Sequence, residues 1–401
     1  VTVVYDLFVL PPPLYFMRIF TGDKIFHYFT SKLIEWTVPI VVGPPAVWCG
    51  MRVWINDLEY FESAKKTGRA LVLSNHGSRV DWLIGMFSGF SGTGIRVGFV
   101  CEWLVKYLPL IGWYRNFVNQ DTFVNRSFES DKPRIEKRID EFHNSNTDMM
   151  LFLAPEGACV DHNDMAKKYI NDCQKFAASQ GYEPFNYVLT PRYKGLTCLA
   201  RHVAERGEIM SITMAFVKDG KLLDERLHSP DRVVPDLYTL FDGWGGSPLS
   251  VYVYARHLDN FNSKSPEEIK KIMMDDYKNK DELLAHFHEH GHFPGVTLDQ
   301  MGEFAVNHPK VHAHILLHNL LWLATAYAAG VLPLVLRSIT WIFATCMVSC
   351  VTGKYLYGST MEAIPFETGI KALMMWMYQR KVKKGKDVST TNTCGDSQQA
   401  Y

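Results

Sequence analysis

The sequence predicts an α/β fold: a twisted, largely parallel sheet flanked by helices, with N-terminal membrane-associated helices and a C-terminal transmembrane hairpin. Two observations lead to this fold class. From Arg69 to His257, short runs rich in β-branched and aromatic residues alternate with helical patterns, as in sheets built from βαβ units. Long apolar stretches lie near both ends of the chain, outside this alternating region.

The alternation defines the elements of the central region one by one. An amphipathic or polar pattern with apolar residues at helical spacing predicts helices, and Ser265-Pro266-Glu267-Glu268 has the residues of a helix N-terminus. Helices are expected at 83–90, 131–143 and 265–290. Buried strands are expected at 70–74, 96–100, 122–124, 149–153, 187–189, 209–216 and 249–254.

The N-terminal stretch does not have the pattern of a signal peptide. Residues 1–20 are apolar, but Pro11 to Pro13 interrupt them, and neither a basic n-region nor a small-residue cleavage site is present. Because the sequence begins with Val1, we expect that part of a first membrane segment is missing. The second apolar run, 33–51, contains Glu35 and three prolines, which predicts a broken or interfacial segment that presses on a bilayer. A buried pair of soluble helices is the alternative.

The C-terminal apolar stretch is the best candidate for crossing a membrane. Leu320–Leu336 is uncharged and about 25 Å long as a helix, near the lower limit for spanning. Pro333 and Arg337 interrupt it before a second apolar stretch at 338–351, so we expect two short segments or a hairpin; a soluble helical hairpin is the alternative. The expected domains are 1–60 (N-terminal membrane-associated helices), 61–260 (α/β domain), 261–310 (surface helix and connector), 311–355 (transmembrane segments) and 356–401 (basic tail).

Composition excludes some classes of function. Lys plus Arg and Asp plus Glu both total 42, so the chain has no overall basic field of the kind that binds nucleic acid. Basic residues do gather at 380–386, which is typical of a cytosolic segment beside anionic lipid, or of a solvated tail. The eight cysteines include no Cys-x-x-Cys pair, so no disulfide framework or zinc knuckle is predicted.

His76 and Asp81 form the strongest chemical signal. His76 follows the strand at 70–74 directly, and Asp81 comes five residues later. Within one regular helix the two side chains would point about 140° apart, so they meet only if His76 lies on a strand-to-helix turn. The carboxylate would then orient the imidazole, whose second nitrogen removes a proton, as in a catalytic triad whose serine is replaced by a substrate hydroxyl.

Further polar residues follow in a fixed order, each at or just after a predicted strand end. Arg126 lies in Thr122-Phe123-Val124-Asn125-Arg126-Ser127 and is suited to bind a phosphate oxygen. Glu156 and Gly157 end Ala154-Pro155-Glu156-Gly157, where the carboxylate can order an arginine or hold a hydroxyl. Pro191 and Arg192 belong to Leu189-Thr190-Pro191-Arg192.

Together these blocks resemble the glycerolipid acyltransferase superfamily, which shares Asn-His-x4-Asp, an arginine block, Pro-Glu-Gly and a later proline block. The resemblance runs from about Leu33 to Gly295 and is nearest to the lysocardiolipin and lysophosphatidylinositol acyltransferase branch. It implies an acyl-CoA-dependent enzyme of the endoplasmic reticulum membrane that acylates a lysophospholipid. His76 would be the base and Asp81 its partner; the substrate-binding residues would be Arg126, Glu156, Gly157, Pro191 and Arg192. No cofactor or metal is implied, because acyl-CoA is a co-substrate.

Two departures and three alternatives accompany this resemblance. Ala154 and Ala158 stand where the family usually has Phe and Thr, which leaves acceptor preference open. The alternatives are a 1-acylglycerol-3-phosphate acyltransferase, a catalytically silent lipid-binding scaffold, and a zinc protease suggested by His288-Glu289-His290-Gly291-His292. Gly291 and the following Phe293-Pro294 disfavour a zinc helix.

Overall fold

The computed structural model describes most of the chain. The described residues are 11–89, 95–107, 111–125, 127–144, 147–160, 164–204, 206–258, 261, 264–304, 306, 308–328, 330, 333 and 337. By its internal contacts the chain divides into two units, of which one comprises 2–235 and 239–319. This larger unit contains the sheet, its covering helices and all residues of the candidate site that the structure describes.

The described elements follow one another in this order. The helices are α2 (Pro11–Val47), α3 (Glu62–Thr67), α4 (Asp81–Phe87), α5 (Ile111–Tyr114), α6 (Phe128–Asn144), α7 (Asp164–Ser179), α8 (Lys194–Leu199), α9 (Leu237–Phe241), α10 (Pro266–His290) and α11 (His308–Ala328). The strands are β1 (Arg52–Ile55), β2 (Arg69–Ser74), β3 (Arg96–Glu102), β4 (Thr122–Val124), β5 (Met149–Leu153), β6 (Glu208–Lys218), β7 (Lys221–Leu222), β8 (Leu249–Leu258) and β9 (Gly302–Glu303).

The described strands form one sheet with a parallel centre. Their order is β4-β3-β5-β2-β6-β8-β1-β9, with β7 paired to β6 outside this path. The five strands at one end of this order run parallel, as expected: β4, β3, β5, β2 and β6. Strand β8 runs antiparallel to β6, and β1 runs parallel to β8. The carboxyl ends of β2, β5 and β3 therefore meet at one edge, where α/β sheets place their sites.

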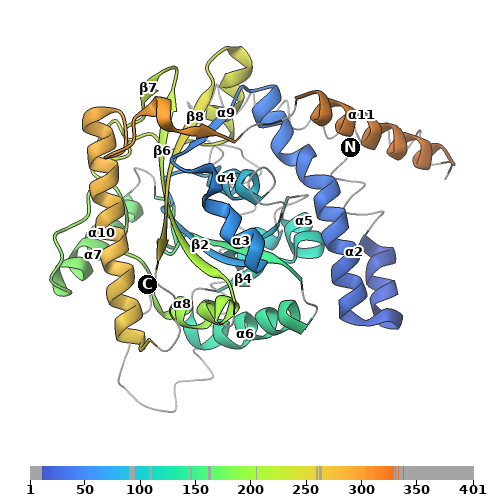
Figure 1. Ribbon diagram of the computed structural model, residues 1–401, viewed down its shortest axis with the longest axis horizontal. Helices are drawn as coiled ribbons and strands as arrows, with labels where there is room; N and C mark the ends of the chain where they lie inside the picture. The colour runs from blue at the N-terminus through green and yellow to red at the C-terminus, as the bar shows by residue number, and fades with distance from the viewer. Residues whose placement is uncertain are drawn as a thin grey trace. The chain divides into compact units, whose positions relative to one another are not determined.

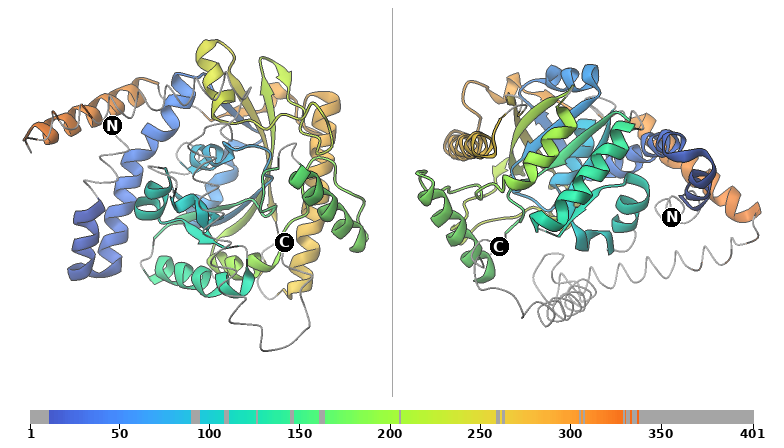
Figure 2. Two further views of the ribbon diagram at one scale, coloured as in Figure 1. Left: turned by 180° about the vertical axis from the view of Figure 1, so that it is seen from behind. Right: turned by 90° about the horizontal axis from the view of Figure 1, so that it is seen from below.

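Helices cover both faces of the sheet (Figure 1). One face of β2 presents Leu71 and Leu73 to a hydrophobic cluster. Helix α10 contributes Met273 and Phe287 to the same cluster, and α6 and α8 contribute further apolar residues. Seen from behind, α10 and α7 lie on one side of the sheet and α2 on the other (Figure 2). The sheet is thus the middle layer, buried on both faces as parallel strands require.

Most expected elements are present, and one strand prediction is wrong. Strands β2, β3, β4, β5, β6 and β8 and helices α4, α6 and α10 coincide with the predicted runs within a few residues. Residues 187–189, however, are irregular, because side chains satisfy their backbone. The carboxylate of Asp281 on α10 accepts hydrogen bonds from the N–H groups of Asn186, Tyr187 and Val188 at 2.9, 2.7 and 3.3 Å. A short apolar run alone does not distinguish this arrangement from a strand.

Helix α2 is a hairpin of two helical arms, which lie side by side in Figures 1 and 2. Gly22 breaks it with φ 77° and ψ 177°, a conformation that glycine adopts without steric cost. Arg18 crosses the bend: its Nε lies 2.6 Å from Asp23 and its guanidinium lies over the ring of Phe26. The chain bends at this glycine, and the three later prolines do not end the second arm before Val47.

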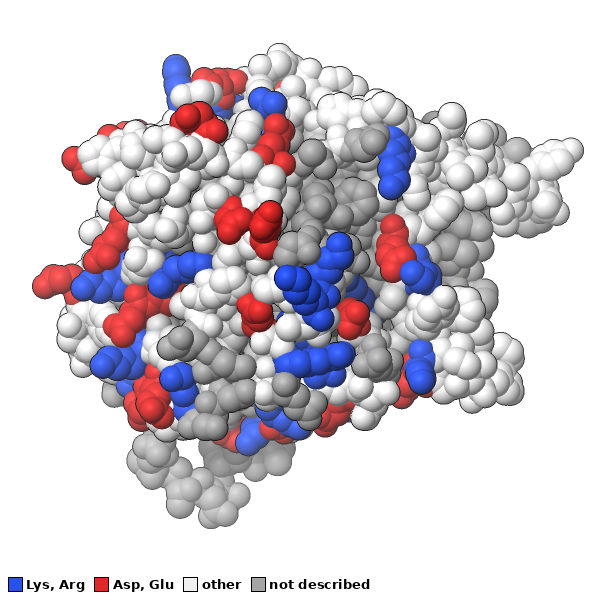
Figure 3. Space-filling view, in the orientation of Figure 1, with Lys and Arg blue, Asp and Glu red and all other residues white. Residues whose placement is uncertain are grey.

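The exposed apolar surface of α2 lies earlier than the predicted interfacial run. Ile34, Val38, Val42 and Ala46 recur every fourth residue and are buried in the domain. By contrast, large apolar side chains near the bend are exposed: Phe16, Ile19, Phe20, Ile25, Tyr28 and Phe29. In Figure 3 the surface over this first part of α2 is mostly white, which marks residues that carry no charge.

The prediction of a C-terminal transmembrane hairpin is wrong. None of the helices within the described ranges combines the length and the hydropathy needed to cross a membrane. Helix α11 begins at His308, earlier than predicted, and its first turns are rich in polar residues that contact α2. Trp36 Nε1 donates to His318 Nδ1 at 2.5 Å, and His314 Nε2 lies 2.7 Å from the carbonyl of Trp36. The predicted second segment, 338–351, and the basic run at 380–386 lie outside the described residues.

Candidate active site

His76 and Asp81 meet on the turn between β2 and α4. His76 is the second residue after the end of β2, and Asp81 is the first residue of α4. His76 Nδ1 lies 2.5 Å from Asp81 Oδ2. The carboxylate side chain is 8% exposed and the imidazole 26%, so Asp81 is shielded while His76 remains accessible. A proton on Nδ1, held by the carboxylate, leaves the lone pair on Nε2.

Asn75 fixes this turn to the neighbouring strand. Its side-chain amide donates to the carbonyl of Met214 at 3.0 Å and accepts from the N–H of Met214 at 2.8 Å. Met214 belongs to β6, so the amide continues the β2–β6 ladder one step beyond the end of β2. Ser78 holds the other side of the turn, accepting from Val80 N and donating to the Pro235 carbonyl, each at 3.0 Å. The backbone around His76 is therefore fixed on both sides.

Glu156 binds the backbone of the site. It follows β5 and is 3% exposed. Its Oε1 accepts from the N–H of His76 at 2.8 Å, and its Oε2 accepts from the N–H of Leu189 at 3.1 Å. One carboxylate thus joins the Asn-His block to the loop before Pro191. Burial raises the pKa of Glu156 to about 7, although the two N–H donors and His76 oppose that shift.

Gly157 and Arg192 lie against each other beside Glu156. Gly157 has φ 70°, and a Cβ there would lie 3.1 Å from Arg192 Nε and 3.2 Å from its Cδ. Arg192 Nη2 donates to the hydroxyl of Tyr169 at 3.0 Å, and that hydroxyl donates to the Glu156 carbonyl, also at 3.0 Å. The backbone N–H of Arg192 donates to the carbonyl of Pro155 at 2.9 Å. The Pro-Glu-Gly and proline blocks therefore form one unit.

The structure gathers most of the expected site residues. His76, Asp81, Glu156, Gly157 and Arg192 converge at the carboxyl edge of the sheet through the contacts above, and buried Pro191 lies between Thr190 and Arg192. The remaining expected residue, Arg126, lies outside the described residues.

Two further residues support the site and were not expected. Tyr169 on α7 joins Arg192 to Glu156, but nothing in its local sequence distinguishes it from an ordinary helical tyrosine. Glu225 is 2% exposed, and its Oε1 would lie 3.0 Å from a Cβ added at Gly77. Burial raises the pKa of Glu225, against the opposing effect of His288. Glu225 follows the short strand β7, which the sequence pattern did not reveal.

Side chains of helix α10 hold the end of β2 in place through hydrogen bonds. Tyr277 donates its hydroxyl proton to the carbonyl of Ser74 at 2.8 Å. The ammonium group of Lys280 donates to the carbonyls of Leu73 and Ile212 at 3.2 and 2.6 Å. Lys280 has no solvent-exposed surface, and its ammonium group lies 3.6 Å from the carboxylate of Asp276, which compensates the buried positive charge. The last carbonyls of β2 are thus held in place just before His76.

The zinc-protease pattern does not have its required geometry. Helix α10 ends at His290, and Gly291 adopts a left-handed conformation with φ 76°. His292 lies beyond this end, so His288 and His292 are not on successive turns of one helix. His288 instead faces Glu225, with 3.7 Å between Nε2 and Oε2.

Comparisons with known proteins place this region among the acyltransferases. Residues 53–215 match the model of the acyltransferase family. The chain is 25% identical over 301 residues to a probable 1-acyl-sn-glycerol-3-phosphate acyltransferase 5 of Arabidopsis thaliana, covering 72% of this chain and 74% of that protein. It is 27% identical over 201 residues to mouse lysocardiolipin acyltransferase 1, covering 50% of each. Mouse 1-acyl-sn-glycerol-3-phosphate acyltransferase epsilon is 26% identical over 264 residues, covering 61% of this chain and 66% of that protein.

The sheet, the His76–Asp81 turn and these similarities define the class of the matched region: residues 53–215 form an acyltransferase domain. The matched region includes all the described site residues from His76 to Arg192. Its relatives fit the glycerolipid acyltransferase superfamily, as the sequence motifs indicated.

Proposed function

We propose that this protein is an acyl-CoA-dependent lysophospholipid acyltransferase that transfers a fatty acyl group to a glycerol hydroxyl. The observation that carries the proposal is the 2.5 Å contact between His76 and Asp81 on an anchored turn. The names of the relatives, 1-acylglycerol-3-phosphate and lysocardiolipin acyltransferases, support a glycerolipid acceptor. By resemblance we place the enzyme at the endoplasmic reticulum membrane.

His76 acts as the general base in this proposal. Nε2 takes the proton of the acceptor hydroxyl while its oxygen attacks the thioester carbonyl of acyl-CoA, which forms a tetrahedral intermediate. When the carbon–sulfur bond breaks, the imidazolium returns the proton to the CoA thiolate. Asp81 holds Nδ1 and stabilises the transient imidazolium without taking its proton. The ester product forms without a covalent enzyme intermediate, and no metal or cofactor is required.

The turn after His76 is the best candidate for stabilising the oxyanion. Gly157 N–H is unsuited, because it donates to the Ala154 carbonyl at 3.2 Å. The N–H groups of Arg79 and Val80 are also occupied, by Pro235 O and Ser78 Oγ. In the described part of the chain, the N–H group of Gly77 has no acceptor, directly follows the base and belongs to a partly exposed residue, whereas Ser78 is buried. We assign the Gly77 N–H to the oxyanion.

Arg192 and Gly157 bind the acceptor's phosphoglycerol group in this account, together with Arg126. The Arg192 side chain is only partly buried and is oriented by Tyr169, so its guanidinium is positioned to bind phosphate. Pro191 shapes the loop that leads to Arg192. Glu156 contributes by fixing both blocks, through its hydrogen bonds to His76 N and Leu189 N.

Lysophosphatidylinositol and lysocardiolipin are the favoured acceptors, from the resemblance in the Asn-His and proline blocks. A 1-acylglycerol-3-phosphate acyltransferase that makes phosphatidic acid is the second candidate, because two of the relatives described above carry that name. Labelled oleoyl-CoA with a panel of these three lysolipids separates the two. Transfer to lysophosphatidylinositol or lysocardiolipin with release of one CoA thiol per product supports the first, and preference for lysophosphatidic acid supports the second. Well-folded protein that transfers to none of them would contradict both.

The apolar end of the α2 hairpin docks on the bilayer in this proposal. Phe16, Ile19 and Phe20 are 65, 75 and 72% exposed. A group of large apolar side chains this exposed is unusual on a protein that is surrounded only by water. The described part of the first arm has about eleven residues before Gly22 and so spans roughly 16 Å, which is less than a membrane-spanning helix needs. This geometry suits a hairpin inserted into one leaflet's interface, from which both substrates arrive.

Flotation with liposomes tests the docking. Replacing Phe16 and Phe20 together by Glu should release most of the protein from vesicles, because two charged groups would enter the apolar boundary. Phe176→Glu on α7 is the matched control, since Phe176 is also exposed but lies outside the hairpin. Undiminished flotation of the double variant would show that α2 is not the docking surface.

A further inference from the structure

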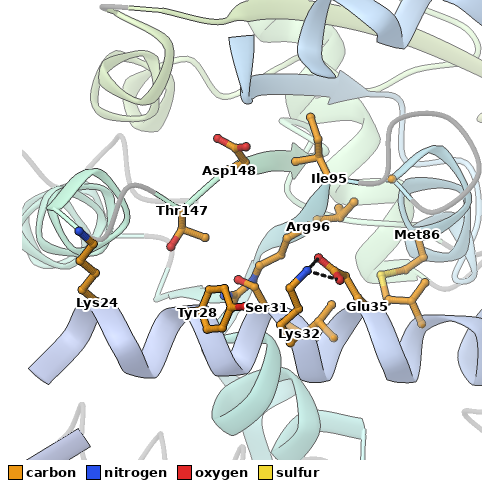
Figure 4. Close-up of a pocket in the computed structure, with 14 residues that line it drawn as sticks. Lys24, Tyr28, Ser31, Lys32, Glu35, Met86, Ile95, Arg96, Thr147 and Asp148 are labelled. Carbon is orange, nitrogen blue, oxygen red and sulfur yellow. Dashed lines mark hydrogen bonds and ion pairs between the residues drawn. The ribbon is translucent and has the colours of Figure 1, made fainter. Parts of the chain in front are cut away.

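A pocket of about 650 Å³ lies far from the candidate active site. It is bounded by the second arm of α2 and by the amino ends of β3 and β5 (Figure 4). Strands β2, β3 and β5 are parallel, and His76 follows the carboxyl end of β2, so the pocket lies at the opposite edge of the sheet. Six residues of β2 separate the two edges, roughly 20 Å. Neither the mechanism nor the acceptor contacts use this pocket.

Arg96 contributes a buried cation to the pocket wall. It is the first residue of β3, is 7% exposed, and its side chain points toward α2 in Figure 4. Its Nη2 donates to the carbonyl of Asn119, and the guanidinium lies 5.8 Å from the ring of Phe142. Its Nε and Nη1, however, have no hydrogen-bond acceptor anywhere in the described part of the chain. Leaving charged donors buried without acceptors is costly, which suggests that a ligand supplies them.

Ser31 gives a second, independent indication on the facing wall. Its hydroxyl oxygen is buried and has no hydrogen-bond partner among the described residues. Ser31 belongs to α2 and lines the same pocket as Arg96. Most buried hydroxyls make a hydrogen bond, so unsatisfied polar atoms on both walls indicate that the site is built for a polar group.

The charges around the pocket favour an anion. Lys32 is paired with Glu35, at 2.8 Å, and Asp148 lies 3.7 Å from Arg206, so these charges are largely compensated. Lys24 is exposed at the pocket wall and has no carboxylate within ion-pair distance in the described part of the chain.

The carboxylate that most affects Arg96 is already occupied. Asp121 acts on Arg96 electrostatically, but it lies 2.5 Å from Arg115 Nε and accepts from Asn119 Nδ2 at 2.6 Å. Arg138 adds positive charge on the same side. Burial lowers the pKa of Arg96 to about 10, so it is still charged at neutral pH. Arg96 and Lys24 therefore remain as the two cations for an anionic ligand.

The rest of the lining indicates a ligand with an apolar part. Ile34, Val38, Met86, Ile95 and Val97 supply aliphatic surface next to the two cations. The same helix, α2, carries the exposed patch proposed above to face the bilayer. An amphiphile whose head is negatively charged fits this combination, and a membrane is its natural source.

We propose that this pocket binds the phosphate group of an anionic phospholipid, as a second lipid site separate from the acceptor site. Arg96 and Ser31 hold the phosphate, Lys24 adds attraction at the wall, and the aliphatic residues contact the glycerol and acyl chains. The supply of lipid from a bilayer rests on the proposed docking of α2, but binding in the pocket does not. Inorganic phosphate shares the recognised chemistry, so the test includes it.

Isothermal titration of the purified full chain tests the proposal without using activity. The probes are dihexanoyl-phosphatidylglycerol, dihexanoyl-phosphatidylcholine and inorganic phosphate, each below its micelle concentration where it has one. The phosphatidylglycerol probe should bind at least tenfold more tightly than the zwitterionic probe. It should bind the His76→Ala variant equally well, so failure of the proposed catalysis would not affect this result.

Variants locate the binding. Lys24→Glu should weaken phosphatidylglycerol binding roughly tenfold, because a charge-assisted contact is worth a factor of this order. Ser31→Ala should weaken it less, and Arg96→Gln should abolish it. Because Arg96 is buried, its variant also requires a thermal melt, whereas Lys24→Glu changes only an exposed side chain. Lys175→Ala on α7 is the control and should bind as the unmodified protein does.

Two results would overturn the proposal: equal binding of the anionic and zwitterionic probes, or unchanged binding in both Lys24→Glu and Arg96→Gln. Binding of inorganic phosphate as tight as that of the lipid, and sensitive to the same variants, would retain the anion site but contradict its assignment to a lipid.

Discussion

Nδ1 of His76 lies 2.5 Å from Oδ2 of Asp81, across a turn that Asn75 and Ser78 fix from both sides. Asp81 comes five residues after His76, and the contact forms because His76 lies on the turn between β2 and α4 while Asp81 begins α4. The contact selects the tautomer with its lone pair on Nε2, the form that a general base requires.

Asp81→Asn should lower kcat on the order of 10²- to 10⁴-fold with little change in KM. The amide can still accept a hydrogen bond from Nδ1, but it does not stabilise the imidazolium. Initial rates at varied lysolipid concentration separate the two parameters. A raised KM with an unchanged kcat would show that Asp81 acts in binding instead.

Gly157→Ala should lower both stability and activity. At φ 70° an alanine costs about 1–2 kcal/mol in backbone strain, and its Cβ would displace Arg192. Gly181→Ala is the matched control, because Gly181 has φ 81° and no atom within 4 Å of the added carbon. Urea midpoints should fall in both variants, whereas acyl transfer should fall only in Gly157→Ala. Equal activity of the two would contradict the role of Arg192.

Glu156 should make the protein less stable as pH rises from about 4.5 to 7. Its pKa is raised to about 7 in the folded protein, so the folded state binds more protons than the unfolded state in this window. Glu156→Gln cannot titrate and should show a smaller loss, although it is less stable overall because its amide faces the N–H of Leu189. The measurement is the difference between the two proteins' free energies of unfolding at pH 5 and pH 7. Parallel pH dependences would contradict the raised pKa.

His27 should have the opposite effect in the acid range. Burial and the nearby arginines lower its pKa to about 4, so the unfolded state binds more protons between pH 6.5 and pH 4. Stability is therefore lost as the pH falls through this window. Because neither ring nitrogen has a hydrogen-bond partner among the described residues, His27→Phe removes the titration without breaking such a bond. Urea midpoints at pH 7 and 5 should converge in His27→Phe; an unchanged gap would contradict the prediction.

The sequence predicts the parallel centre of the sheet because each central strand is a short apolar run, and these runs alternate with helical patterns. It also places His76 and Glu156 just after strands that the structure contains, and the structure brings the block of Arg192 beside them. It fails at residues 187–189, because an apolar triplet does not reveal that Asp281 on α10, far along the chain, binds its backbone. The support from Tyr169 and Glu225 depends on such long-range packing as well.

The C-terminal prediction failed for a related reason. Hydropathy alone drew attention to Leu320–Leu336, whereas the histidines of α11 before this run contact α2 through Trp36. Local patterns describe strands well, but they do not show which face of a helix a distant partner covers.

The most direct test of the central claim compares acyl transfer by the unmodified protein and His76→Ala, with labelled oleoyl-CoA and the preferred lysolipid. Circular dichroism and liposome flotation establish that both are folded and membrane-bound. The account predicts that His76→Ala loses activity by at least about 10²-fold while both controls remain unchanged. Transfer by folded His76→Ala at the unmodified rate would contradict His76 as the base.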